Sequence, residues 1–412
     1  MDQHALSGLL ASARVQGRLP KILLVTCSTM MDVDGGTVLF RALLPFVPKG
    51  RLAWAVAGGA TRRVPPWMEG VPRSVQVSAI FEPRLAGLAR RSPLRRVWWW
   101  SAFRRFPAVA AKRIARFAVA QGVDRVWVHA GASGIPTAVE LHRLTALPMH
   151  VSVQDDVSGH VAPREGALLR PAFEELLRRA STIDVISAPM KAYYQSRYAM
   201  PREPMIVWTG GDGGPVQPPP QIAPKLRRIG YAGNLWATDA MRVLVEAVER
   251  LNKMRDKHDR MVVVIHGARR PPGFTTSSAV EYRGLLSPDD LTRELRTCDL
   301  LYVPMSFLPR YEVLSRTSLP AKIVHYMQAQ IPILAHGPDY AANIGFVRER
   351  HIGFTSTTQD PHQLAEALAA IEADALSRVS VSRTSRDLFE TEFSPQAVWR
   401  RLSGLLGFVP GE

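Results

Sequence analysis

Short apolar runs rich in β-branched residues alternate with amphipathic stretches along most of the chain. The runs mostly end on glycine or a small polar residue. The stretches between them, such as residues 241–256 and 289–298, repeat their apolar positions every three or four residues. The expected strands are residues 21–27, 52–58, 74–80, 124–130, 149–155, 183–188, 205–211, 227–233, 261–267, 280–284, 299–304 and 331–337. This alternation predicts an α/β fold with parallel sheets, whose loops at the carboxyl ends of the strands build a site.

One stretch that suits neither a helix nor a central strand divides the chain. Residues 210–228, GGDGGPVQPPPQIAPKLRR, hold four glycines and then five prolines. We therefore expect an N-terminal domain over residues 1–212, a linker over 213–226 and a second domain over 227–385. Residues 386–412 contain a further helix start, with Ser394 as N-cap and Pro395 at the first helical position.

Composition narrows the class of protein. The 412 residues suffice for two domains with cores, and no apolar run reaches the length that spans a bilayer. The N-terminus lacks the pattern of a signal peptide. Cys27 and Cys298 both sit in apolar runs, which favours small buried residues over a disulfide, and no cysteine–histidine cluster has metal-binding spacing. These features favour a cytoplasmic location.

The positive charge is unevenly distributed. The net charge is +16, and residues 1–215 carry 28 Lys and Arg against 15 Asp and Glu, a net +13. Residues 83–123 alone hold ten basic side chains and no acidic one. A local field of this kind attracts a polyanion, which here means nucleic acid, anionic lipid or a phosphorylated substrate.

Residues 90–106, RRSPLRRVWWWSAFRRF, place this charge beside aromatic side chains. We expect Pro107 to break the helix, so that residues 107–121 form a core helix and residues 84–106 a projecting basic element. Core packing explains the first part, whereas nucleic-acid binding and interfacial membrane binding both use the residue types of the second. On a helical wheel the apolar stripe comprises Trp99, Phe103, Phe106, Ala110, Ile114 and Phe117.

Residues 317–338, TSLPAKIVHYMQAQIPILAHGP, predict a helix followed by a strand. Ser318 and Pro320 are helix-start signals, which put Lys322 in the first turn. The helix dipole disfavours a cation there unless an anion binds at the same N-terminus, where free N–H groups and Lys322 would converge on it. Lys322 is therefore either a solvated side chain or an anion ligand, and the local sequence leaves both open.

The ordered series of motifs resembles the GT-B glycosyltransferases, in particular the large retaining family 4 (glycosyl transferases group 1). Residues 317–338 resemble the donor-binding helix of that family, and residues 21–37 its first strand and glycine loop. Further similar segments are residues 124–156, 180–212, 228–235 and 285–304. The resemblance covers most of the chain. It implies two Rossmann-like domains facing a cleft, with the C-terminal helix of residues 386–412 returning toward the N-terminal domain.

The resemblance implies that the second half binds a nucleotide-sugar donor. The diphosphate would lie near Ser318 and Lys322, and the base near the turn at residues 282–285. The family's Glu-x7-Glu pair is missing, because Thr317 and His325 stand at its positions, and no Arg or Lys follows the strand at 227–233. The expected donor-binding residues are Gly35, Gly36, Gly233, Asn234, Gly267, Tyr282, Arg283, Leu285, Ser318, Lys322 and His325.

The first half would hold the acceptor and the catalytic residues, His129, Asp155 and Asp156. His129 matches the family's active-site histidine, although a histidine at a strand end is commonly structural. Asp155 and Asp156 would act as general base in an inverting enzyme, or are loop acids or a helix cap.

Gly35 and Gly36 would let backbone amides approach a sugar or phosphate, or form a tight turn. The DVD at residues 32–34 resembles an Asp-x-Asp metal motif but follows the first strand, so no metal is expected.

Within this family context the basic aromatic segment favours an anionic membrane over nucleic acid. We expect a cytoplasmic glycosyltransferase on the inner face of the cell membrane. It would move a hexose-type sugar to a lipid-linked or saccharide acceptor in polysaccharide or glycolipid synthesis, with retention and without metal or cofactor. A catalytically silent GT-B scaffold of a polysaccharide-assembly complex is the alternative, and a nucleic-acid binder is a third possibility. The expected membrane-binding residues are Arg95, Arg96, Trp98, Trp99, Trp100, Arg104 and Arg105.

Overall fold

The computed structural model describes residues 19–30, 35–59, 63–156, 163–211, 218–267 and 277–408. The chain divides into two compact units, the first comprising Met1–Trp208 with Val398–Glu412 and the second Thr209–Ala397. It leaves the first unit once and re-enters it within the last helix, α17 (Pro395–Leu405). Each unit has its own sheet and its own hydrophobic core.

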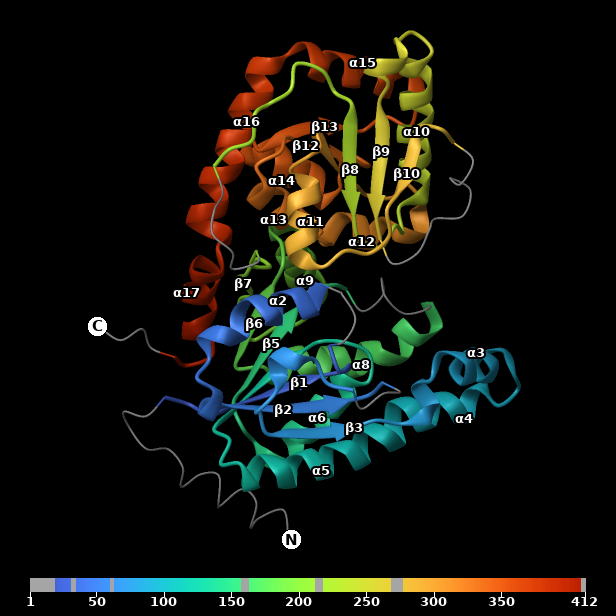
Figure 1. Cartoon of the computed structure of the whole chain (residues 1–412). Coiled ribbons are helices and arrows are strands. Elements are labelled where there is room, and N and C mark those ends of the chain that lie inside the picture. Colours follow the sequence, from blue (N-terminus) through green and yellow to red (C-terminus); the bar gives the residue numbers. More distant parts are fainter. Residues whose placement is uncertain are drawn as a thin grey trace. The chain divides into compact units, whose positions relative to one another are not determined.

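The first unit contains a parallel sheet of seven strands in the order β3-β2-β1-β4-β5-β6-β7 (Figure 1). The order turns back between β1 and β4, and in open α/β sheets a ligand crevice forms at such a turning point, outside the carboxyl ends of the strands. The strands are β1 (Ile22–Thr26), β2 (Leu52–Ala57), β3 (Arg73–Gln76), β4 (Arg125–His129), β5 (Met149–Val153), β6 (Thr182–Val185) and β7 (Met205–Ile206).

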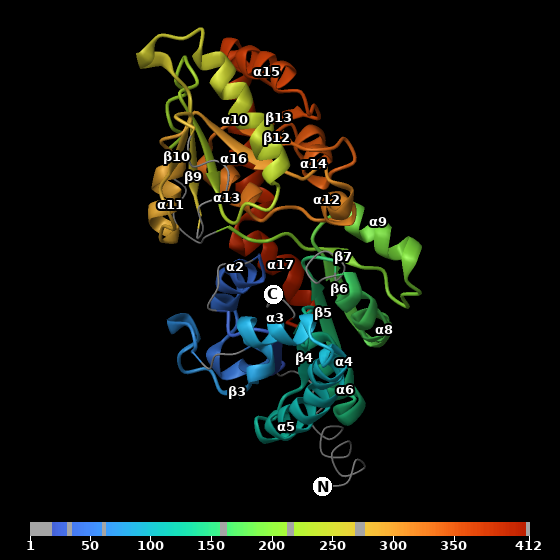
Figure 2. The ribbon, with the colours of Figure 1, turned by 90° about the vertical axis from the view of Figure 1, so that its right-hand side faces the viewer.

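Helices cover both faces of this sheet. On one face α2 and α17 share a core with the strands, in which Phe40, Trp54 and Leu402 are fully buried. On the other, α5, α6 and α8 pack side by side (Figures 1 and 2). The remaining helices are α2 (Gly35–Leu43), α3 (Pro83–Arg91), α4 (Arg95–Trp100), α5 (Phe106–Ala120), α6 (Gly134–Thr145), α8 (Pro163–Arg179) and α9 (Ala188–Arg197).

A wide turn interrupts the long helix of the first unit without breaking it. α4, a π-helical turn at Ser101–Arg105 and α5 follow one another directly. The buried positions Trp98, Ala102 and Pro107 are four and then five residues apart, because a π turn contains an extra residue. Pro107 cannot donate to the preceding turn, and the π turn accommodates it. The predicted break at Pro107 is therefore wrong, and the apolar stripe begins at Trp98 rather than at Trp99.

The second unit contains a parallel sheet of six strands in the order β10-β9-β8-β11-β12-β13. Here the order turns back between β8 and β11, which is again the position of a ligand crevice in sheets of this kind. The strands are β8 (Arg228–Ala232), β9 (Val262–His266), β10 (Val280–Tyr282), β11 (Leu300–Pro304), β12 (Ile333–His336) and β13 (Gly353–Ser356).

Two helices, α10 and α15, share the main core of the second unit with the strands, and Tyr231 and Tyr302 are fully buried in it. α13 packs on β11 and β12 and contacts both α11 and α16. The helices are α10 (Thr238–Asn252), α11 (Pro288–Leu295), α12 (Glu312–Thr317), α13 (Lys322–Ala329), α14 (Ala342–Arg350), α15 (Pro361–Ala373) and α16 (Ala375–Leu388).

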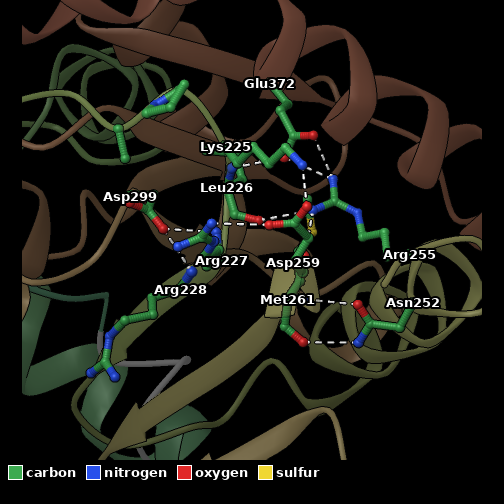
Figure 3. Close-up of polar contacts among 12 residues, drawn as sticks. Lys225, Leu226, Arg227, Arg228, Asn252, Arg255, Asp259, Met261, Asp299 and Glu372 are labelled. Atoms are coloured by element: carbon green, nitrogen blue, oxygen red, sulfur yellow. Dashed lines mark hydrogen bonds and ion pairs between the residues drawn. The ribbon is translucent and has the colours of Figure 1, made fainter. Parts of the chain in front are cut away.

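Paired charges hold the amino edge of this sheet, where β8 begins (Figure 3). Glu372 accepts hydrogen bonds from the Leu226 amide and from Arg255, each at 2.7 Å. Further contacts join Asp299 to the amides of Arg227 and Arg228, Asp259 to Lys225 and Arg227, and Asn252 to Met261. The network closes the end of the sheet that lies opposite the crevice.

The twelve expected strands are confirmed, although β7 is only Met205–Ile206. The helix start at Ser394 is also confirmed, since its hydroxyl accepts the Ala397 amide at 3.3 Å and α17 begins at Pro395. The pattern missed β13, whose four residues GFTS include a single large apolar side chain.

The predicted linker, residues 213–226, lies partly outside the described residues. Its described part, residues 218–226, belongs to the second unit, where Leu226 is fully buried. Buried Arg378 donates to the carbonyls of Ala223 and Pro224 at 2.6 and 3.1 Å. This part of the segment is therefore packed against the unit that it precedes.

Candidate functional site

The candidate donor site lies at the carboxyl ends of β8 and β11, where the strand order of the second unit turns back. Ser318 ends α12 here and is buried, and its amide donates to the Leu314 carbonyl at 2.9 Å. α13 begins at Lys322. The predicted place of Lys322 in the first turn of a helix is thus confirmed.

The amides of this first turn are partly occupied. Ile323 donates to the Pro320 carbonyl at 3.0 Å, and Val324 donates to the Ala321 carbonyl at 3.1 Å. The expectation that free N–H groups converge with Lys322 on an anion is wrong for these two amides. An anion at this helix end would therefore depend mainly on the Lys322 side chain.

Two buried tyrosines place Lys322 over the end of β8. The Tyr326 hydroxyl, one turn after Lys322, accepts the Ala232 amide at 2.9 Å and joins α13 to the strand. The Lys322 Nζ lies 3.8 Å from the ring centroid of Tyr231, a cation–π contact. Gly233 follows with φ of +103°, and a Cβ there would lie 3.6 Å from the Lys322 Nζ. The left-handed backbone requires glycine and leaves open space in front of the amine.

Lys322 has no counter-charge in the described part of the chain. Its amine makes no hydrogen bond or ion pair with a described residue, and only the Tyr231 ring contacts it as a charged group. Burial lowers the pKa of Lys322 to about 7. A desolvated cation without a partner is unfavourable, and an incoming anion relieves that penalty. This environment favours the anion ligand over the solvated side chain.

Asn234 and His325 flank this position. Asn234 is exposed, and its carbonyl accepts the Tyr231 hydroxyl at 2.7 Å, which turns the chain after Gly233. His325 is half-buried on α13, three residues after Lys322. Gly233, Asn234, Lys322 and His325 are thus brought to one edge of the sheet.

The turn expected to hold the base follows the neighbouring strands, β9 and β10. Gly267 donates its amide to the Gly284 carbonyl at 3.0 Å, and the Tyr282 hydroxyl donates to the Gly267 carbonyl. Leu285 is 60% exposed. Because Tyr282 uses its hydroxyl within the turn, the backbone and Leu285 are what the turn presents to a ligand.

Arg283 is engaged by acidic neighbours. It pairs with Glu281 at 2.7 Å and with Glu294 at 3.0 Å. The hydrogen bond to Glu281 is the main cause of the raised pKa of Arg283. Arg283 is therefore committed to the turn itself and is a weaker candidate for a donor contact than the sequence suggested.

Several residues outside the predicted set join the two loops that flank the crevice. Trp236, after β8, contacts Tyr311, after β11, with ring centroids 5.4 Å apart. Asp239 accepts the Ser306 hydroxyl at 2.8 Å and the Phe307 amide at 2.7 Å. These contacts join residues far apart in the chain, so nothing in the local pattern indicated them.

In the first unit, His129 ends β4 at the carboxyl edge. Its ring packs edge-on against Phe40 of α2, with centroids 5.4 Å apart. A Cβ on Gly36 would lie only 2.4 Å from the same imidazole. Gly36 therefore has a packing reason to be glycine, and the preceding residue, Gly35, begins α2. The structure thus brings His129 and the two glycines together.

Asp155 and Asp156 follow β5, beside β4, and differ in their surroundings. Asp156 is 2% exposed, and its charge affects the pKa values of Tyr194 and Tyr198. Burial first and the Asp156 charge second raise the pKa of Tyr198 to about 12, and the same two causes raise the pKa of Tyr194. Asp155 is half-buried. Of the two carboxylates, Asp155 is the more accessible to an acceptor.

The residues 83–105, here called the basic hairpin, comprise α3, α4 and the π turn. Trp98 is 7% exposed, and its indole donates to the Ile80 carbonyl at 2.9 Å. It belongs to a small core with Ala86 and Ala102, so its predicted role as a membrane-binding residue is corrected. Trp99 is half-buried and Trp100 is 55% exposed. Exposed arginines surround them at Arg95, Arg96, Arg104 and Arg105.

No helix among the described residues is long and apolar enough to cross a membrane. The same residues contain no group of three or more His, Cys, Asp or Glu side chains that suits a metal ion.

Comparisons with known proteins agree with this architecture. A family model described as glycosyl transferases group 1 matches residues 226–374, in the second unit. No curated protein matches the chain significantly.

Solved structures match almost the whole chain at low identity. HepE from Anabaena, in complex with UDP and glucose, is 14% identical with a TM-score of 0.67, over 95% of this chain and 100% of HepE. Sucrose-phosphate synthase from Thermosynechococcus elongatus is 13% identical with a TM-score of 0.67, over 94% of this chain and 98% of its own. The lipopolysaccharide outer core galactosyltransferase WaaB is 11% identical with a TM-score of 0.58, over 94% of this chain and 98% of WaaB.

These matches fit the two parallel α/β units, in each of which the strand order turns back once. The predicted fold, two Rossmann-like domains of the GT-B type, is confirmed. The group 1 family model thus matches the second unit alone, and the solved structures show the GT-B fold over almost the whole chain.

Proposed function

We propose that this protein transfers a hexose-type sugar from a nucleotide-sugar donor to a lipid-linked or saccharide acceptor in cell-surface polysaccharide or glycolipid synthesis. The observation that carries the proposal is the position of half-buried Lys322 at the carboxyl edge of the second sheet. Its amine lies over the Tyr231 ring and in front of Gly233, and it forms no ion pair with a described residue. The complexes of HepE with UDP and with UDP-glucose support a donor of this class. The activity in the name of WaaB supports a glycan acceptor.

In this proposal Lys322 holds the donor diphosphate. Its ammonium lies in front of Gly233, whose missing side chain leaves room for phosphate oxygens. The phosphate supplies the counter-charge that the protein lacks, and the cation stabilises the charge that develops on the leaving diphosphate. The turn at Gly267 and Leu285 would receive the base through backbone groups and apolar contact. Retention and independence from a metal are part of the proposal, as the family resemblance implies.

The first unit would offer the acceptor to the sugar. His129 and Asp155 lie at the carboxyl ends of adjacent strands, where an acceptor hydroxyl would approach. α2 orients the His129 ring through Phe40 and Gly36, which supports its proposed role as a fixed group beside the acceptor. Asp155 would serve as general base only in an inverting reaction.

The basic hairpin would bring the protein to the cytoplasmic face of an anionic membrane. Its exposed apolar side chains are Leu85, Leu88, Leu94, Val97 and Trp100, with 51, 70, 66, 60 and 55% exposure. They replace buried Trp98 as the proposed insertion face. Each arginine beside them adds about 1 kcal/mol of attraction to an anionic surface.

The donor site is tested by Lys322→Ala, with Lys253→Ala as the matched control. Lys253 is exposed and follows α10, at the opposite edge of the sheet. Isothermal titration with UDP-glucose, then with GDP- and TDP-sugars, should show donor affinity about ten- to a hundredfold weaker in Lys322→Ala, since charge-assisted hydrogen bonds contribute about 1.5–3 kcal/mol. Unchanged affinity in a folded Lys322→Ala protein would reject the site. No binding of any nucleotide sugar by the wild type would instead support the silent scaffold.

The membrane face is tested by Leu94→Ser, Val97→Ser and Trp100→Ser combined. In a flotation assay the triple variant should no longer float with anionic vesicles, while its UDP-glucose binding should stay at the wild-type level. A variant that still floats would contradict the assignment of this face. Tighter, steeply salt-dependent binding to DNA or RNA than to vesicles would indicate a nucleic-acid surface. Trp98→Ser is the contrasting variant, because it should lower the melting temperature rather than release a folded protein.

A further inference from the structure

A groove lies beside the basic hairpin, on the outer side of the helices of the first unit. Its volume is about 610 Å³, within the range of small-molecule sites. The π turn with the start of α5, the middle of α6 and the middle of α8 form its walls. It begins near Pro136, in the first turn of the helix that follows His129, so it starts beside the carboxyl edge and runs away from it.

The floor of the groove is apolar. Pro107, Val139 and Leu169 are buried and line it, and Phe103 and Leu168 form its sides. Leu168 is 48% exposed. An aliphatic chain would cover these side chains.

The two ends of the groove differ in charge. At one end Arg143 is paired with Glu140 at 2.6 Å, and Glu175 beside it is shared among Arg143, Arg178 and Arg179, so the cations there have acidic partners. At the other end Arg96 and Arg104 form no ion pair with any described residue. A ligand with a negative head and an apolar body would therefore have one favoured direction.

Two irregularities of the backbone and one polar atom mark the groove as a binding site. The wide π turn carries Phe103 and Arg104, and Pro171 interrupts the hydrogen bonding of α8 on the opposite wall. π turns are frequent at functional sites. The indole nitrogen of Trp99, which lines the groove, is buried and has no hydrogen-bond partner in the described part of the chain. The nitrogen is covered in the unliganded structure, so a ligand oxygen can accept its hydrogen only if the indole turns toward the groove.

We propose that this groove binds one phosphate-bearing lipid taken from the membrane, with its phosphate at Arg96 and Arg104 and its chain along the floor. The inference rests on the proposed function, because the ligand belongs to the class of lipid-linked acceptors named there. The lipid enters beside the exposed face of the hairpin, and Trp99 donates to an oxygen of the head. The groove thus aligns the lipid chain so that the head lies beside α6, the helix reached from His129.

The test is isothermal titration of the full chain with dihexanoyl phosphatidic acid below its micelle concentration. Dihexanoyl phosphatidylcholine and inorganic phosphate are the comparison ligands. We expect saturable binding of one phosphatidic acid, and at least tenfold weaker binding of the other two. Equal binding of inorganic phosphate would reduce the site to an anion site and overturn the proposal. No binding of the soluble lipid by a protein that still floats with vesicles would assign membrane contact to the hairpin face alone.

Ala172→Trp fills the groove from α8, and Ala167→Trp, exposed on the same helix outside the groove, is its matched control. We expect at least tenfold weaker lipid binding for Ala172→Trp and none of this loss for Ala167→Trp. Wild-type binding by Ala172→Trp would place the lipid elsewhere. If Ala172→Trp does not fold, Leu168→Asp puts a charge on the wall and should give the same loss.

Two further measurements assign the polar contacts and separate this proposal from the transferase function. Trp99→Phe should weaken phosphatidic acid about threefold, and Arg96→Gln with Arg104→Gln should abolish its preference over phosphatidylcholine. A glutamate-rich peptide that competes as well as the lipid would indicate an acidic protein partner and overturn the assignment. UDP-glucose binding should remain unchanged in Ala172→Trp. Failure of the donor test with success here would leave a lipid-binding protein without the proposed donor.

Discussion

The two edges of the second sheet differ in whether their charged side chains have partners. At the amino edge, Glu372 and Asp299 accept the amides at the start of β8, and Arg255 completes the pairing (Figure 3). At the carboxyl edge, Lys322 is desolvated and has an aromatic ring where a carboxylate would stand. Pairing at one edge contributes stability, whereas the missing partner at the other costs stability and leaves a place for an anion. The difference indicates which edge was shaped for a ligand.

Breaking the paired edge should give the largest effect. Glu372→Ala removes the acceptor of the buried Leu226 amide and both hydrogen bonds from Arg255, while alanine suits the helix α15. We expect the free energy of unfolding to fall by about 2–3 kcal/mol, because a buried donor and a partly buried cation lose their partner. Urea denaturation measures the change.

The Glu372→Ala variant should also leave donor binding intact. UDP-glucose affinity of folded Glu372→Ala should equal that of the wild type, because Glu372 lies at the opposite edge from Lys322. Loss of donor affinity without loss of stability would mean that the two edges are coupled, and the division of roles would be wrong.

The sequence predicted one edge better than the other. Alternating apolar runs indicated all strands except β13, and a proline and a serine before Lys322 indicated where α13 begins. Both signals are local in the chain. The pairing of Glu372 with Leu226 joins residues 146 positions apart, and the contact between Trp236 and Tyr311 joins two separate loops. Only the folded sheet brings such pairs together.

The basic hairpin shows the same limit. Its charge and aromatic content were plain in the sequence, but the π turn shifts which tryptophan is buried. A regular helix puts Trp99 and Phe103 in the core, whereas the added residue puts Trp98 and Ala102 there. The wide turn follows from Pro107 and its packing. A helical wheel assumes a regular α-helix and therefore cannot represent this turn.

Removing the unpaired charge of Lys322 should raise the free energy of unfolding, whereas removing the paired charge of Glu372 should lower it. Lys322→Met keeps the length of the side chain and removes the desolvated amine, so we expect the unliganded protein to gain about 1–2 kcal/mol at neutral pH. A lysine is protonated in the unfolded chain below its ordinary pKa of 10.5, while burial lowers the pKa to about 7 in the folded protein. The destabilisation by Lys322 is therefore largest below pH 7 and decreases as the pH rises toward 10.5.

Urea denaturation of the wild type and Lys322→Met at pH 6.5 and pH 9.5 checks this sign. The gain should be larger at the lower pH. A variant that is less stable than the wild type at both values would show that Lys322 is a packing residue. UDP-glucose at a concentration that saturates the wild type should stabilise it more than it stabilises Lys322→Met.

The smallest effect concerns the pH dependence of donor binding. In the proposed donor site only the protonated amine attracts the diphosphate, and the bound anion would raise the pKa of Lys322 above its value of about 7 in the free protein. Binding then takes up a proton above pH 7, so affinity for UDP-glucose should fall toward tenfold per pH unit from about pH 7 upward, which is about 1.4 kcal/mol per unit. Below pH 7 the affinity should be level. Titration calorimetry from pH 6 to pH 9 should give this curve for the wild type and a flat line for Lys322→Met. The same slope in Lys322→Met would assign the proton to a group other than Lys322, and a flat wild-type curve would mean that Lys322 keeps its charge without a donor.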